Sequence, residues 1–176
     1  MHQLLADTLA AFDALGLAFN DVPSLGANPF RRLGDFKTLE DMERWFALFL
    51  EEAQRLVEGR RQRLSELKAV AAESYIREHY MEPELSLQRV CSALALSKSY
   101  LSSIFKAYSG MTVVEFLTQV RIEEAQIMLG SGDAKIYEVA EAVGFRDPHY
   151  FSLTFRKQTG QSPTEFRERA WWPAEK

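Results

Sequence analysis

Apolar residues recur at helical spacing in two short segments of the second half of the chain. In residues 87–94 one face carries the apolar side chains of Leu87, Val90, Cys91 and Leu94. In residues 136–143 the same face is repeated 49 positions later by Ile136, Val139, Ala140 and Val143. The pattern predicts two short amphipathic helices. The small residues Cys91 and Ala140 occupy matching positions, which is typical of helices that cross closely.

A longer repeat follows each short helix. The stretch YLSSIFKAYSG begins at Tyr100 and the stretch YFSLTFRKQTG begins at Tyr150, so Tyr, Ser, Phe and Gly recur at a constant offset of 50. In the second copy Asp147 is expected to cap a helix, Pro148 to open it, and Gly160 to end it in a left-handed conformation. The first copy is expected to run over residues 97–110 by the same logic. A short helix, a turn and a second helix form the helix-turn-helix signature, so the chain is predicted to contain it twice.

Each repeat is followed by a capping box. Thr112 with Glu115 and Ser162 with Glu165 place a hydroxyl first and a carboxylate three residues later. The first box is expected to open a helix over residues 112–129, whose apolar stripe is Val113, Phe116, Leu117, Val120 and Met128. About seventeen residues at about 1.5 Å each would separate the two units by roughly 25 Å. Two reading helices at that separation can reach successive major grooves, which lie about 34 Å apart.

Arg121 interrupts the apolar and acidic pattern of this connecting helix. One interpretation is a structural ion pair with an acid such as Glu138 or Glu141, and the other is a phosphate contact. We favour the ion pair.

The first eighty residues are less informative. From Leu39 the pattern is helical, and a seven-residue repeat, interrupted at Gly59 and Arg60, is approximated by Leu50, Ala53, Val57, Leu64, Leu67 and Ala71. The repeat predicts either a short coiled coil that dimerises the chain or a helix that packs on its own C-terminal domain. Before residue 38 the Gly, Pro and Asn of FNDVPSLGANPFRRLGDF indicate a loop.

Two helix-turn-helix units joined by a long helix resemble the DNA-binding domain of the AraC/XylS family of bacterial transcription regulators. The resemblance rests on YLSSIFKAYSG, on RIEEAQIML at residues 121–129, and on IYEVAEAVGFRDPHYFSLTFRKQTGQSPTEFR at residues 136–167. It implies an all-α fold, with residues 1–64 as a helical linker or dimerisation segment and residues 65–172 as the double helix-turn-helix domain. The segment that ends near ESYIREHY is also similar to the output half of YesN-type response regulators. The chain is then either the output part of a longer protein or a stand-alone regulator, and phosphorylation control is not inferred.

The second helix of each unit is the expected reader of DNA, because its first turns enter the major groove. In the first unit the candidate DNA-binding residues are Ser97, Lys98, Ser99, Ser102, Ser103 and Lys106. In the second unit they are Arg146, Asp147, His149, Ser152, Leu153, Arg156 and Lys157. Lys and Arg attract phosphates, whereas Ser and His can contact base edges. A solvated surface role is the alternative for Ser102, His149 and Ser152.

Two features depart from what such a domain leads us to expect. Many family members carry Arg directly after the matched Ser, where this chain has Ser103 and Leu153. Because Arg is the strongest guanine reader, specificity is expected to depend more on DNA shape. The chain has a net charge of −4, and residues 83–176 hold eleven Lys and Arg against eleven Asp and Glu. Such a neutral domain predicts modest non-specific binding.

Composition argues against other classes of protein. The longest apolar stretch, WFALFL at residues 45–50, is far too short to span a bilayer. The single cysteine allows no internal disulfide, and Cys91 is expected to be a buried small hydrophobe rather than a redox sensor. Three scattered His and the absence of a glycine-rich phosphate loop offer no catalytic or metal site, so neither an enzyme nor a cofactor is expected.

We therefore expect a cytoplasmic, sequence-specific DNA-binding transcription regulator, an activator by family resemblance. Its expected partners are double-stranded DNA, RNA polymerase and a second copy bound through the N-terminal segment, with no membrane. The alternative function is a helical protein–protein interaction module that ignores DNA. Two copies of a unit are fewer than the three or more that helical repeat proteins need.

Overall fold

The structure, a computed structural model, describes residues 3, 6, 7, 10, 13, 14, 36–132 and 134–171. It forms two compact parts, residues 1–64 and residues 65–176, and each is described by itself. The described residues form helices joined by turns, with no strand among them, so the expected all-α fold is confirmed. The loop expected before residue 38 lies outside the described residues except for its last position. Residue 172, the expected end of the domain, also lies outside them.

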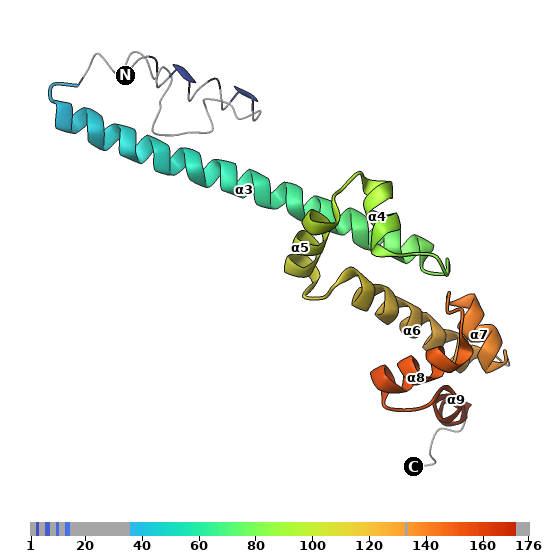
Figure 1. The fold of residues 1–176 in the computed structure, drawn as a ribbon. Coiled ribbons are helices and arrows are strands. Elements are labelled where there is room, and N and C mark those ends of the chain that lie inside the picture. The colour runs from blue at the N-terminus through green and yellow to red at the C-terminus, as the bar shows by residue number, and fades with distance from the viewer. Residues whose placement is uncertain are drawn as a thin grey trace, which may run out of the picture. The chain divides into compact units, whose positions relative to one another are not determined.

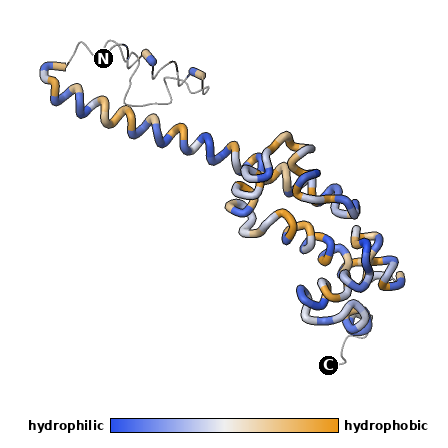
Figure 2. Tube along the Cα trace, in the orientation of Figure 1, coloured by the Kyte–Doolittle hydropathy of each residue, from blue (hydrophilic) through white to orange (hydrophobic). Residues whose placement is uncertain are grey.

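Within residues 1–64, the described core belongs to the N-terminal half of helix α3 (Leu39–His79). Trp45, Phe49 and Ala53 recur every four residues, so they share one face of the helix, and all three are buried. The rings of Trp45 and Phe49 are stacked with their centroids 5.9 Å apart. Apolar and polar bands alternate along α3 in Figure 2, as an amphipathic helix requires.

Residues 65–176 contain both helix-turn-helix units. The first unit consists of α4 (Leu87–Leu94) and α5 (Lys98–Ser109). The end of α3 and the start of α6 (Val113–Ser131) complete its core (Figure 1). The buried residues of this core are Ala72, Ile76, Leu85, Val90, Cys91, Leu101, Ile104, Phe105, Val113, Phe116, Leu117 and Val120. Cys91 is therefore a buried small hydrophobe, as expected.

The part of α3 that packs on this core differs from the predicted seven-residue repeat. Ala72 and Ile76 belong to the core, whereas Leu64, Leu67 and Ala71 of the repeat are exposed. This part of the helix thus packs on the helix-turn-helix core through a face that the repeat did not mark.

The second helix-turn-helix consists of α7 (Ile136–Ala142) and α8 (Pro148–Thr159), followed by α9 (Pro163–Trp171). Its core is formed by Ile122, Ala125, Leu129, Val139, Ala140, Val143, Phe145, Phe151 and Phe155. The connecting helix α6 therefore contributes to both cores, the first up to Val120 and the second from Ile122 onward. Figure 1 shows α6 between the two helix pairs.

The predicted start and stop signals of α5 and α8 are confirmed. The Ser97 hydroxyl accepts from a backbone N–H of the first turn of α5 at 3.3 Å, and the Asp147 carboxylate does the same for α8 at 2.8 Å. Gly110 and Gly160 end the two helices with φ of 76° and 79°. Both capping boxes are also formed, at the starts of α6 and α9.

The ion pair expected for Arg121 was wrong. Its Nε donates to the backbone carbonyl of Tyr80 at 2.8 Å, and its Nη2 donates to the carbonyl of Glu82 at 2.7 Å. Glu138 and Glu141 are both exposed on α7. The turn after α3 returns to the middle of α6 and supplies oxygen acceptors about forty residues away in sequence, which the local pattern around Arg121 does not reveal.

Candidate nucleic-acid interface

The turns of the two helix-turn-helix units have the same backbone geometry. The N–H of Leu96 donates to the carbonyl of Cys91 at 2.9 Å, and the N–H of Phe145 donates to the carbonyl of Ala140 at the same distance. These pairs are related by the offset of 49. After them the second turn contains one additional residue, Arg146, which changes the offset to 50 before the reading helix begins. The chain therefore positions α5 and α8 on their partner helices in equivalent ways.

Helix α5 has a clearly divided surface. Leu101, Ile104 and Phe105 are buried, as the spacing predicts. The opposite face is exposed and consists of the predicted residues Lys98, Ser99, Ser102, Ser103 and Lys106. Ser97 is exposed too, but its hydroxyl oxygen already accepts the capping bond, which leaves its proton as the group available to a ligand. The structure thus brings all six predicted residues of the first unit onto one helix and its cap.

Helix α8 presents a less polar face. His149, Leu153, Arg156 and Lys157 are exposed, with Leu153 58% accessible. Ser152 is only half-buried, and its hydroxyl donates to the carbonyl of Pro148 at 2.9 Å, so its proton is engaged within the helix. Ser152 is therefore a weaker candidate for base contact than Ser102, although the two match in sequence.

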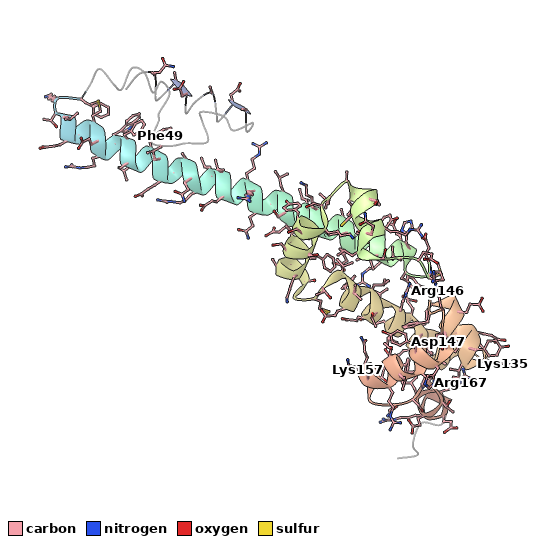
Figure 3. The ribbon with its side chains drawn as sticks, in the orientation of Figure 1. Phe49, Lys135, Arg146, Asp147, Lys157 and Arg167 are labelled. Carbon is pink, nitrogen blue, oxygen red and sulfur yellow. The ribbon has the colours of Figure 1, made fainter. Side chains whose placement is uncertain are left out.

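The additional residue Arg146 forms an ion pair with Glu84, which lies before α4. Both side chains are mostly exposed to solvent, so the pair contributes little to stability. Arg146, Asp147 and Lys157 are labelled in Figure 3, the first two at the start of α8 and the third near its end. The guanidinium of Arg146, a predicted DNA contact, is thus shared with a carboxylate that lies before α4.

The repeated tyrosines were not predicted as site residues, and their surroundings differ. Tyr150 is 61% accessible next to the exposed face of α8. Tyr100 is half-buried, because its hydroxyl lies 3.2 Å from the Ser65 hydroxyl and the Lys68 Nζ lies 5.0 Å from its ring centre. The repeat itself was the available signal, since a tyrosine precedes the buried position of each reading helix.

Two basic residues of the reading helices lie near carboxylates. The backbone N–H of Thr112 lowers the pKa of Glu115, and the charge of Lys106 contributes in the same direction. Ser162 and Arg156 have the same effects on the pKa of Glu165. Because each cation is partly balanced locally, the surface attracts phosphate less than an isolated basic helix would.

The described part of the chain contains no group of three or more His, Cys, Asp or Glu side chains that could hold a metal ion. No helix within it is both long enough and apolar enough to cross a membrane.

Comparison with known proteins agrees with this geometry. A family model described as a helix-turn-helix domain matches residues 90–169. The C-terminal domain of AraT, a response regulator from Geobacillus stearothermophilus, is 37% identical, with a TM-score of 0.57 over 57% of this chain and 84% of that domain. This chain belongs to the AraC/XylS family.

Two further similar proteins show how far the similarity extends. The uncharacterized HTH-type transcriptional regulator YijO of Escherichia coli K12 is 38% identical over 99 residues, which are 56% of this chain and 35% of that protein. The DNA-binding domain of AdpA, a global transcriptional factor solved in complex with a target DNA, is 27% identical, with a TM-score of 0.56 over 61% of this chain and 97% of that domain. The chain spans about a third of the length of the curated relatives it matches.

Proposed function

We propose that this chain is the DNA-binding part of a transcription regulator and recognises a specific duplex sequence through α5 and α8. The observation that carries the proposal is the repeated turn geometry, which presents two capped helices with exposed polar faces on one connecting helix. The similarity to the AdpA domain, which was solved on its target DNA, supports the proposal. A protein interaction module would have no need for two such matched reading helices.

The exposed side chains suggest a division of roles. Lys98, Lys106, Arg156 and Lys157 would contact phosphates, because they are exposed cations on the two reading helices. Ser99, Ser102, Ser103 and His149 would contact base edges, and Leu153 would meet a thymine methyl group. Ser97 and Asp147 would act mainly by capping the helices. Ser152 keeps a secondary role, because its hydroxyl is bonded to its own helix.

Arg146 would contact a phosphate only after its ion pair with Glu84 opens. A phosphate that approaches the start of α8 can replace Glu84, because both members of the ion pair are solvent-exposed. Part of the attraction would then be offset by the repulsion between Glu84 and DNA.

Several finer properties belong to the proposal as well. By family resemblance the protein would activate transcription together with RNA polymerase in the cytoplasm, and it would have no enzymatic activity. Similarity to the AraT domain supports a role as the output part of a response regulator. Exposed Leu64 and Leu67 support a second copy of the chain as a partner through α3. Sedimentation of the chain at several concentrations would show whether it dimerises.

The experiment that tests the proposal is selection of bound duplexes from a random DNA library at near-physiological salt. We expect a motif with two dissimilar half-sites about ten base pairs apart, because α5 and α8 carry different side chains. A chain in which Ser99 and His149 are both replaced by Ala should select a different motif, because both side chains are proposed base contacts. No enrichment, together with no DNA retardation at low salt, would contradict the proposal and favour the interaction module.

A further inference from the structure

The two helix-turn-helix cores meet at Tyr80, in the turn that follows α3. The half-buried ring of Tyr80 packs against both cores, which otherwise share no side chain among those described. Burial raises the pKa of the Tyr80 hydroxyl, and a hydrogen bond with Glu124 of α6 contributes in the same direction. One side chain of the first unit is therefore part of the packing of the second.

Arg121 connects the same turn to α6 and to the second unit. Its two hydrogen bonds hold the carbonyls of Tyr80 and Glu82, and its guanidinium lies 5.6 Å from the centre of the Phe145 ring. Burial lowers the pKa of Arg121. The Tyr80 carbonyl, directly after the last residue of α3, partly compensates its charge, because a helix C-terminus is the negative end of the helix dipole. The Arg121 guanidinium is thus held between the two helix-turn-helix units by two hydrogen bonds to backbone carbonyls.

Gly144 brings the turn of the second unit against the same carbonyl. A Cβ at this position would lie 2.6 Å from the Tyr80 oxygen and 2.9 Å from the Arg121 Nη2. The backbone there has a φ of +87°, which also favours glycine. The close approach therefore requires a residue with no side chain.

We propose that Tyr80, Arg121 and Gly144 form a joint that fixes the orientation of α8 relative to α5 and so determines the half-site spacing that the protein accepts. This inference rests on the proposed function. Without the joint, the two helix-turn-helix units would be connected by α6 and by the exposed Arg146–Glu84 ion pair, and each unit could rock on its share of that helix. Shifting a half-site by one base pair moves it by about 3.4 Å along the duplex and about 35° around it, so a rigid pair of helices would reject the shift. In this scheme Arg121 is a positioning residue that does not contact DNA.

The first test measures the joint without DNA, so it does not depend on the proposed function. Spin labels are placed at the exposed positions Ala107 on α5 and Gln158 on α8, in a background with Cys91→Ala, which copies the matched Ala140. We expect a narrow distance distribution for the chain with an intact joint and a distribution at least about twice as wide after Arg121→Gln. A broad distribution in the chain with the intact joint would overturn the inference, and so would equal widths in the two chains. The first of these outcomes needs no change at the three residues of the joint and applies even when Arg121→Gln fails to fold.

The second test measures spacing tolerance on the duplex that the library selection provides. The spacer between half-sites is lengthened or shortened by one base pair, and a third duplex carries one scrambled half-site. For the unchanged protein we expect about a tenfold loss of affinity on either altered spacer. Arg121→Lys keeps the positive charge but loses the planar pair of N–H donors that binds both carbonyls. For this variant we expect a loss of affinity below about threefold on either altered spacer, with affinity for the scrambled duplex unchanged.

The matched control is Glu84→Gln, which removes the exposed ion pair that also spans the two units. It should keep the full spacing preference, because an exposed pair holds its partners weakly. Full spacing preference in a folded Arg121→Lys chain would overturn the inference and assign spacing to α6 alone. If the unchanged protein bound no duplex, the proposed function would fail, while the spin-label distances would still decide whether the joint exists.

Discussion

Ala95 and Gly144 occupy the same left-handed turn position in the two helix-turn-helix units, with φ of 53° and 87°. Gly144 has a steric reason to be glycine, because a side chain would meet the Tyr80 carbonyl. Ala95 is exposed, so its side chain fits, but its backbone lies in a region that L-residues rarely adopt. The first unit therefore carries backbone strain that the second unit avoids.

We expect Ala95→Gly to raise the free energy of unfolding by about 1 kcal/mol, because relief of the left-handed strain outweighs the added flexibility of the unfolded chain. Urea denaturation followed by circular dichroism would measure the change. Gly144→Ala is the mirror substitution and should destabilise the protein. A loss of stability in Ala95→Gly would show that the turn is not strained.

Substitutions on the two reading faces should act on different half-sites. Ser99→Ala should change base preference in one half-site and His149→Ala in the other, each by about 1–3 kcal/mol at the contacted base pair. Both side chains are exposed, so circular dichroism and the unfolding midpoint should not change. The preference would be measured by competition between duplexes that differ at single positions. Unchanged preference in both variants would show that the reading face has been assigned incorrectly.

The exposed cations of α5 and α8 should determine the salt dependence of binding. Four variants each carry one substitution to Gln, at Lys98, Lys106, Arg156 or Lys157. Each substitution should reduce the slope of log K against log salt by about 0.9 if the residue neutralises one phosphate. Arg55→Gln is a matched control, because Arg55 is an exposed cation paired with Glu51 on α3. Titrations at several salt concentrations would give the slopes. A slope unchanged by all four substitutions would place the phosphate contacts elsewhere.

The capping carboxylates make stability depend on pH on the acid side. The pKa values of Glu115 and Glu165 are lowered chiefly by the backbone N–H groups that they cap, those of Thr112 and Ser162. A carboxylate with a lowered folded-state pKa stabilises the fold at pH values above its unfolded-state pKa, and this contribution is lost as pH falls through the folded-state pKa. Glu115→Gln with Glu165→Gln should therefore lower the unfolding midpoint at neutral pH and flatten its decline below about pH 4.5. Thermal melts from pH 7 to pH 3 that decline in parallel for both proteins would contradict this origin.

Much of the domain was predictable because its signals are local. Ser97 and Asp147 lie next to the N–H groups that they cap, and Gly110 and Gly160 end helices through their own backbone conformation. Inward residues such as Phe105 and Phe155 follow from helical spacing alone. The exposed face of each reading helix follows from the same spacing, so the predicted residues of α5 lie together as expected.

The errors and omissions concern residues that are distant in the chain. Arg121 meets carbonyls about forty positions away, Arg146 meets Glu84, and Tyr100 meets Ser65. None of these contacts has a periodic signal, because each depends on where a turn or a helix end lies after packing. Ser152 differs from Ser102 for a related reason, since the carbonyl that receives its proton is chosen by side-chain rotation and not by residue type.

The sequence by itself determined two repeated helix-turn-helix units, their caps and the side chains they expose, because hydrophobic periodicity and capping act within a few residues. The tertiary structure alone decided how the two units contact each other outside the connecting helix. The carbonyl of Tyr80 becomes the meeting point of Arg121 and Gly144 only when the turn after α3 folds back on α6. Backbone acceptors look alike at every residue, so a sequence cannot show which one a distant guanidinium will find.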